Sequence, residues 1–130
     1  MKTISLCIAL LIGIATAGFA ADAAAGKPAG KLYHVVSFKF KDTATKEQIQ
    51  QVEKAFADLK KQIKVIKSLD WGTNISPENL NKGFTHCWVL TFKNEQDRDA
   101  YLKHPDHEAF AKIVGPVLGD VFVVDFRAQR

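Results

Sequence analysis

Histidines and a tyrosine are the side chains of this sequence best suited to exchange protons with a small organic molecule. His104 and His107 lie in one short stretch with Tyr101 and Pro105. Proline lacks a backbone N–H and restricts the residue before it, so a helix that runs through Tyr101 is expected to end at or before His104. Pro105 suits the first position of a new helix, which places His107 in the first turn of that helix.

His107 heads an apolar stripe at helical spacing, so its ring is expected to face the interior. In that place it could act as a general base that removes a proton next to a carbonyl, and the positive end of the helix dipole would keep it neutral. Tyr101 could orient this histidine or polarise a carbonyl through its hydroxyl. The alternative is a buried histidine with a satisfied hydrogen bond beside an ordinary aromatic at the edge of the core.

His34 and His86 each lie near the start of a segment that alternates apolar and polar residues. We expect both on the helix-facing side of neighbouring antiparallel strands, towards opposite ends of a pocket, which argues against a shared metal ion. His104 and His107 would be one turn apart only in a continuous helix, and Pro105 argues against one. We therefore predict no metal site.

Cys87 and His86 cannot form a nucleophilic pair, because adjacent strand residues point to opposite faces of a sheet. The other cysteine, Cys7, falls in the N-terminal segment. Cys87 is thus the only thiol expected in the mature chain, where it would be buried at an interface or pair between chains.

Four segments are predicted as strands from their alternation or their β-branched and aromatic content. They are residues 32–41, 65–75, 84–92 and 121–126, with Gly72 marking a bulge or close approach in the second. Three helices are predicted between them. Thr45 and Gln48 form a capping box for the first, whose opposite side, including Glu53, is expected to be solvated. Asn94 caps the second, and the third runs over residues 105–118 and ends near Gly119.

This order predicts an α+β fold of the ferredoxin-like βαββαβ type, with a four-stranded antiparallel sheet in the order 4-1-3-2 and helices on one face. The reverse side of the sheet is also too apolar for water. We assign Val35, Cys87, Val89, Val121 and Val123 to it. Two such sheets packed together would hide both faces, which predicts a homodimer through the sheet face, closed into a dimeric α/β barrel.

The N-terminus has the pattern of a cleaved signal peptide over residues 1–20, with Lys2 before an apolar run and small residues up to Ala20. Residues 21–30 are predicted to be a flexible linker and residues 31–130 the folded domain. The protein is therefore expected in the periplasm or outside the cell, with no stable membrane insertion after cleavage. A net charge of +4, without a concentrated Lys/Arg stripe, does not indicate a nucleic-acid partner.

The segments 34–41, 83–92, 101–107 and 123–126 together resemble the stress-responsive A/B barrel (Dabb) family, over roughly residues 31–127. The resemblance implies the same fold and the dimer. It also implies a site, because the family includes a plant polyketide cyclase of the olivetolic acid cyclase type, which closes a poly-β-keto chain by aldol condensation. The catalytic tyrosine and histidine of that cyclase correspond to Tyr101 and His107, and its further pocket histidines to His34 and His86.

Three functions follow from these observations. The first is a binding or stress-response module that holds a small apolar or carbonyl-containing molecule in a pocket between sheet and helices. We expect that pocket to be lined by His34, His86, Phe38 and Trp88, without a cofactor. The second is a cofactor-free enzyme of the cyclase or lyase type, with Tyr101 and His107 as catalytic residues. The third is a haem- or metal-binding relative, since other dimeric α+β barrels bind haem.

Overall fold

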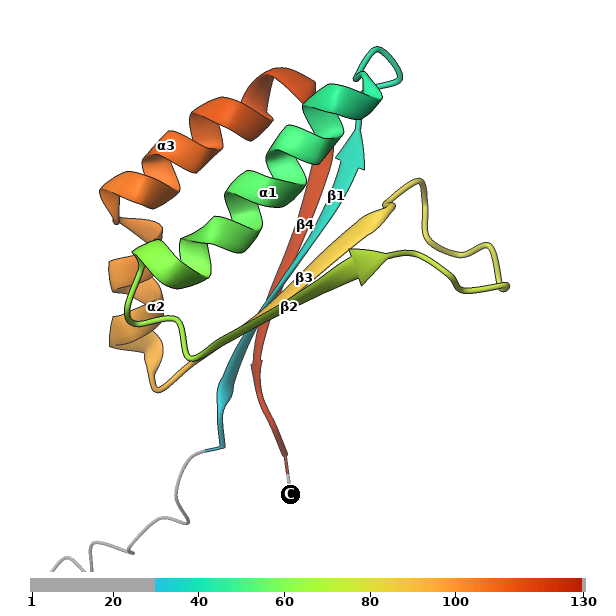
Figure 1. The fold of residues 1–130 in the computed structure, drawn as a ribbon. Helices are drawn as coiled ribbons and strands as arrows, with labels where there is room; N and C mark the ends of the chain where they lie inside the picture. Colours follow the sequence, from blue (N-terminus) through green and yellow to red (C-terminus); the bar gives the residue numbers. More distant parts are fainter. Residues whose placement is uncertain (1–29, 130) are drawn as a thin grey trace, which may run out of the picture.

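The computed structural model describes residues 30–129, and these form a ferredoxin-like βαββαβ domain (Figure 1). The signal peptide predicted over residues 1–20 and all but the last residue of the predicted linker lie outside the described residues. The elements in chain order are β1 (Leu32–Phe40), α1 (Lys46–Gln62), β2 (Ser68–Thr73), β3 (His86–Phe92), α2 (Glu95–Leu102), α3 (Pro105–Val114), a 3-10 turn (Gly115–Val117) and β4 (Leu118–Arg127). Within the described residues, no helix is both long and apolar enough to cross a membrane.

The four strands form one antiparallel sheet in the order β2-β3-β1-β4, as predicted. Helices α1 and α3 cover one face of it, and no described element covers the other (Figure 1). Because β1 and β3 are the central strands, their alternate residues supply the buried side chains of the sheet, and the helices and connecting segments supply the rest of the core.

Local signals set the helix starts where the sequence places them. Thr45 and Gln48 form the capping box of α1, each side chain bonding the other residue's backbone N–H. The Asn94 side chain accepts from the Asp97 N–H at the start of α2. His104 caps α3 by accepting from the Asp106 N–H, and Pro105 is the first helical residue. His107 therefore lies in the first turn of α3, as predicted.

Several boundaries differ from the sequence prediction, most clearly around α3, β4 and β2. Helix α3 ends at Val114, because Pro116 lacks an N–H and the chain tightens into a 3-10 turn. Strand β4 consequently begins at Leu118, and Gly119 lies within it at an irregularity opposite Lys39 and Phe40. A side chain on Gly119 would meet the Lys39 carbonyl oxygen at 3.1 Å. Strand β2 is shorter than predicted, and its pairing with β3 runs through Gly72 without a bulge.

Aromatic rings fill the space between the sheet and the two long helices. Trp88 on β3 packs parallel to Phe56 of α1, with 4.6 Å between ring centroids. Phe38 of β1 lies against Trp88 at 4.5 Å and stacks on Phe110 of α3. Trp88 and Phe56 are almost completely buried. Burying a large apolar side chain stabilises a fold by about 1.5–3 kcal/mol, so this cluster fixes the helices on the sheet.

The side of β4 that faces the helices was predicted wrongly. Val36 of β1 pairs with Val123 and Phe38 pairs with Val121, so both valines lie on the helix-facing side. The helix-free face instead carries the other residues of β4, which pair with outward-facing residues of β1. The apolar residues of that face are Tyr33, Val35, Cys87, Val89, Phe122, Val124 and Phe126. Phe122 is 54% and Phe126 45% exposed, so this face is more apolar than the sequence analysis assumed.

Candidate active site between the sheet and helices α2 and α3

A cavity of about 400 Å³ lies between strands β1 and β4 on one side and helices α2 and α3 on the other. Most of its wall is apolar, contributed by Val36, Phe38, Phe110, Val121 and Val123 among others. Four polar side chains also line it: His34, Tyr101, His107 and Asp125. An apolar hollow with a few convergent polar groups is the usual form of a small-molecule site.

Three rings from three elements meet at the polar part of the cavity. Tyr101, in the last turn of α2, is 4.6 Å from His107 of α3, measured between ring centroids in an edge-to-face arrangement. His34 of β1 lies 5.7 Å from Tyr101 in the same kind of contact. The His104–Pro105 step creates this arrangement, because it ends α2 just after Tyr101 and starts α3 just before His107. The structure thus brings together three of the predicted site residues.

The environment keeps Tyr101 and His107 uncharged. Burial raises the pKa of the Tyr101 hydroxyl far above its ordinary value of 10.0, so it remains a hydrogen-bond donor. Burial also lowers the pKa of His107, and a proton on His34 would lower it further. A hydrogen bond to the Leu102 backbone and the charge of Glu108 act in the opposite direction. The net effect is a neutral imidazole, the state expected from the sequence, although burial rather than the helix dipole is the main cause.

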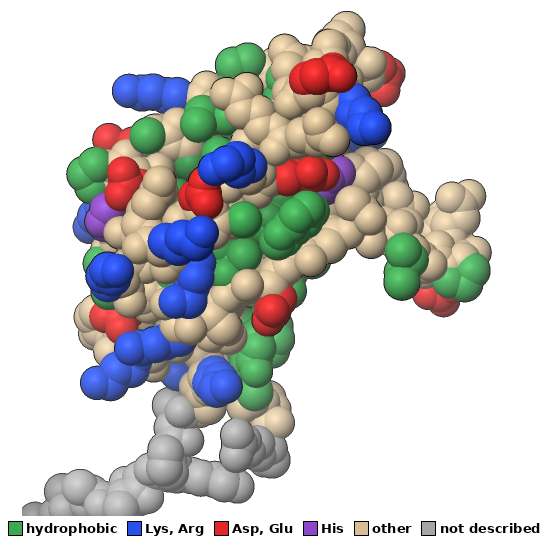
Figure 2. Space-filling model, in the orientation of Figure 1, with side chains coloured by type: hydrophobic (Ala, Val, Ile, Leu, Met, Phe, Trp, Pro, Cys, Tyr) green, Lys and Arg blue, Asp and Glu red, His purple; other side chains and the backbone are tan. Residues whose placement is uncertain are grey.

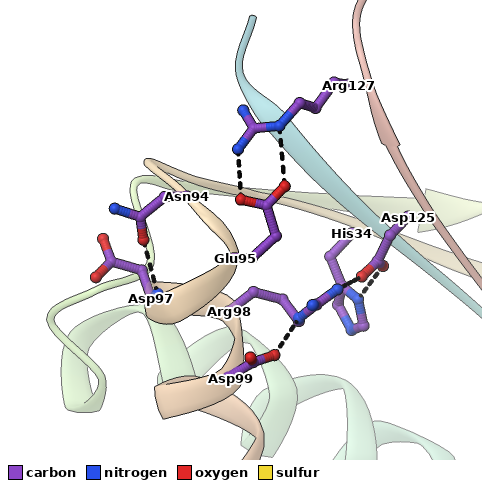
Figure 3. Close-up of polar contacts among 8 residues, drawn as sticks. All are labelled: His34, Asn94, Glu95, Asp97, Arg98, Asp99, Asp125 and Arg127. Carbon is purple, nitrogen blue, oxygen red and sulfur yellow. Dashed lines mark hydrogen bonds and ion pairs between the residues drawn. The ribbon is translucent and has the colours of Figure 1, made fainter. Parts of the chain in front are cut away.

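Asp125 and Arg98 belong to this site, and no sequence pattern predicted either of them. His34 and Asp125 are directly paired across β1 and β4, and His34 Nδ1 lies 2.6 Å from Asp125 Oδ1. The other carboxylate oxygen of Asp125 accepts a hydrogen bond from the Arg98 guanidinium, whose Nε donates to Asp99 at 2.7 Å (Figure 3). His34 Nδ1 donates to the carboxylate, which leaves Nε2 as the free nitrogen of that ring.

A second ion pair joins the same two elements. Arg127 of β4 donates through two nitrogens to the Glu95 carboxylate of α2, at 3.0 and 2.6 Å (Figure 3). Its third nitrogen donates to the Gly30 carbonyl at 2.7 Å. Helix α2 is therefore held against β4 by two arginine–carboxylate contacts. The helix supplies the arginine of one contact and the strand supplies the arginine of the other. Sequence alone could not reveal either contact, because each joins residues about thirty positions apart whose alignment depends on the register of β4.

His86 lies away from the cavity. Phe38 pairs with His86 whereas His34 pairs with Leu90, so the two histidines are four residues apart along adjacent strands. His86 is buried, and its two ring nitrogens contact Glu53 Oε1 at 2.9 Å and Thr85 Oγ1 at 2.8 Å. Glu53, predicted to lie on a solvated face, is half-buried and links α1 to the sheet through this contact.

The remaining predicted pocket residues are divided between the cavity and the core. Phe38 lines the cavity, whereas Trp88 is fully buried beneath α1 and does not contribute to the cavity wall. The Trp88 indole N–H has no hydrogen-bond partner among the described residues. Within residues 30–129, no group of three or more His, Cys, Asp or Glu side chains is placed to hold a metal ion.

Comparison with known proteins identifies relatives that span nearly the whole domain. The chain is 36% identical over 98 residues to the stress-response A/B barrel domain-containing protein HS1 of Arabidopsis thaliana, covering 75% of this chain and 90% of the relative. It is 26% identical over 97 residues to olivetolic acid cyclase of Cannabis sativa, covering 75% and 96% of the two chains.

Solved structures show the same fold. Hydroxynitrile lyase from Passiflora edulis matches with a TM-score of 0.73 at 26% identity, covering 78% of this chain and 96% of that one. A dimeric ferredoxin-like protein of unknown function from Thermobifida fusca matches with a TM-score of 0.66 at 30% identity, covering 76% and 92%. The family model of the stress responsive A/B barrel domain matches residues 32–128. The chain therefore belongs to the stress-responsive A/B barrel domain family, as its sequence motifs indicate.

Proposed function

We propose that this protein is a homodimer that binds a small, uncharged, largely apolar molecule with a carbonyl or hydroxyl group. The observation that supports this most directly is the meeting of His34, Tyr101 and His107 at one part of an otherwise apolar cavity. The one carboxylate in the wall, Asp125, is already paired with Arg98, so the cavity offers no free charge to an ionic ligand. The Tyr101 hydroxyl can donate to a ligand oxygen, and a neutral imidazole can accept from a hydroxyl.

The helix-free sheet face is the proposed dimer interface. Its apolar residues are too numerous for a solvated antiparallel face, and a large exposed apolar patch usually marks an interaction site. A two-fold pair buries the same patch of both copies. The relative from Thermobifida fusca is described as dimeric, which supports this assembly.

A second candidate function is proton-transfer catalysis on a carbonyl compound, favoured by the un-ionised Tyr101 hydroxyl beside the neutral His107 ring. In this scheme, the Tyr101 O–H donates to the carbonyl oxygen while His107 takes the proton from the adjacent carbon. The resulting enolate carbon attacks a second carbonyl carbon, and the imidazolium returns its proton to the new alkoxide. Two relatives carry the names of a cyclase and a lyase, which supports this candidate.

Acetophenone is a suitable probe because it combines an apolar ring with one carbonyl. Binding is measured by NMR titration, with the chemical shifts of the histidine rings as the readout. We expect Tyr101→Phe and His107→Ala to weaken binding about tenfold each, which corresponds to about 1.4 kcal/mol. His104→Asn serves as the control, because asparagine also caps a helix and His104 does not line the cavity. Shift changes confined to residues outside the cavity would contradict the proposal.

Catalysis is tested separately with the same probe in D₂O. A base at His107 would exchange the methyl protons of acetophenone for deuterium, and NMR follows the loss of the methyl signal. We expect exchange above the buffer rate for the native protein and none above it for His107→Ala. Binding without exchange would support the binding function alone.

The proposed location is the periplasm or the cell exterior. The N-terminal pattern of Lys2, an apolar run and small residues up to Ala20 supports it. Mass spectrometry of the protein from the native host is expected to find a mature N-terminus at Ala21. An intact Met1 in the cytoplasmic fraction would contradict export.

A further inference from the structure

Apolar side chains on both edge strands of the sheet face the helix side without being covered by the helices. Val121 and Val123 of β4 are 45% and 49% exposed, although both line the cavity. Trp71 of β2 is 41% exposed. It shares the helix side because it pairs with the buried Trp88. The cavity is therefore open along β4, and the uncovered tryptophan lies on the opposite edge strand.

Strand register places these side chains in one row across the sheet. Trp71 pairs with Trp88, Trp88 with Val36, and Val36 with Val123. Within one copy, β3 and β1 separate Trp71 from Val123, so the two cannot meet. Between two copies they can, because β2 and β4 are the free edges of the same sheet.

A two-fold axis parallel to the strands brings these edges together. When two sheets face each other about such an axis, β2 of one copy comes to lie beside β4 of the other, and residues of one row stay at the same level. The strands β2 and β4 run in opposite directions, so the joint can be an antiparallel pair. Both joints together close an eight-stranded barrel and remove all four free edges.

We propose that the second copy completes the cavity: the partner's Trp71 packs on Val123 and Val121 and supplies the wall that this chain leaves open. The helix-facing sides of the two sheets form the outer surface of the barrel, and this surface is continuous where β2 of one copy meets β4 of the other. The indole covers the valines on that outer surface. The site is then shared between protomers, and its size and apolar character depend on assembly. This inference rests on the proposed sheet-face homodimer, closed into a barrel, and adds a residue of the partner to its site.

The segment that follows Trp71 supports the same contact. Residues 74–85 connect β2 to β3 and project beyond the sheet, with Ile75 93% and Leu80 67% exposed (Figure 1). Figure 2 shows hydrophobic side chains at the end of this projection, separated from the body of the domain. Within one copy, Val121 of β4 and His86 of β3 lie in the same row across the sheet, and His86 directly follows this segment. At a joint between β2 and the partner's β4, the segment therefore extends towards the partner's Val121. In the dimer, the exposed apolar side chains of this segment can pack on the surface of the partner.

Cysteine cross-linking tests the contact. In a Cys87→Ser background, the double variant Trp71→Cys with Val123→Cys is oxidised with copper phenanthroline and analysed on non-reducing gels. We expect covalent dimers at high yield, because residue 71 of each copy meets residue 123 of the other. The single variants are the matched controls: each is expected to remain monomeric on the gel, and a mixture of the two is expected to yield covalent dimers.

The outcomes separate this inference from the proposed dimer. Efficient cross-linking of Trp71→Cys alone would mean that β2 meets β2 of the partner, and a native-mass dimer without any 71–123 product would mean that the edges do not meet. Either result overturns the inference and leaves the sheet-face dimer standing. A monomeric mass for the native protein by light scattering overturns both.

A measurement on the native protein provides a second test without cysteine substitutions. Trp71 and Trp88 are the only tryptophans, and Trp88 is fully buried, so iodide quenching reports Trp71. We expect the quenchable fraction of the fluorescence to fall as protein concentration rises through the monomer–dimer transition. A constant quenchable fraction across that transition would show that the indole stays in water and would overturn the inference.

Discussion

Asp125 is expected to be the most important carboxylate for the stability of the folded domain. It holds His34, which is only 5% exposed, and Arg98, whose side chain is 21% exposed. Hydrogen bonds to charged groups contribute about 1.5–3 kcal/mol each. Asp125→Asn keeps the shape and one oxygen acceptor but removes the charge from both contacts. Because the carboxylate is about one-quarter exposed, we expect a loss of about 2 kcal/mol in the free energy of unfolding.

Equilibrium unfolding in urea measures this loss. The protein concentration must be the same for all variants, because dissociation of a dimer makes apparent stability depend on concentration. Asp99→Asn is the matched control: it removes a carboxylate from the same arginine, but at a side chain 53% exposed. Exposed ion pairs contribute about 0.2–1 kcal/mol, so the control should lose less than half as much.

A double-mutant cycle then isolates the contact between Asp125 and Arg98. Because both single variants break the same ion pair, Arg98→Leu in the Asp125→Asn background should cost about 1 kcal/mol less than in the native protein. Equal losses for Asp125→Asn and Asp99→Asn, with additive effects in the cycle, would refute the view that this network stabilises the site.

Three further predictions concern other parts of the domain. The pKa of His107 is lowered in the folded state, so below pH 6.5 the unfolded chain binds more protons and the free energy of unfolding should fall with falling pH; urea titrations should show a shallower decline for His107→Gln. Thr45→Ala should lower the stability by about 1 kcal/mol through loss of the α1 cap, and Thr45→Ser should restore it, as judged by thermal unfolding. Glu53→Ala leaves the buried His86 without its carboxylate and should cost about 1–3 kcal/mol in urea, whereas Glu47→Ala on the exposed first turn should cost under about 0.5 kcal/mol.

The candidate site was only partly predictable from the sequence. Tyr101 and His107 are close in the chain and separated by a proline, so local rules were enough to place both at the junction of two helices. Asp125 is 91 positions from His34, and Glu53 is 33 positions from His86. Contacts of that range depend on strand register and helix packing, which no local pattern specifies.

Strand β4 shows most clearly where the pattern was ambiguous. Its residues from Val121 to Val124 are all apolar, so alternation cannot decide which side faces the helices. A shift of one residue in register moves every side chain to the other face. The irregularity opposite Lys39 and Phe40 and the pairing of Val36 with Val123 decide it, and they bring Asp125 into the cavity.

The amino-acid sequence by itself determined the order of the elements, the strand order of the sheet and the helix starts at Thr45, Asn94 and Pro105. The element order and the helix starts follow from periodicity and from capping groups that act within a few residues, and the strand order follows from the βαββαβ order of the elements. Only the tertiary structure decided which histidines share a cavity, which carboxylate holds His34 and which apolar side chains remain uncovered. The physical reason is that these properties depend on the alignment of whole strands, and that alignment is set by the sum of many weak contacts between distant segments.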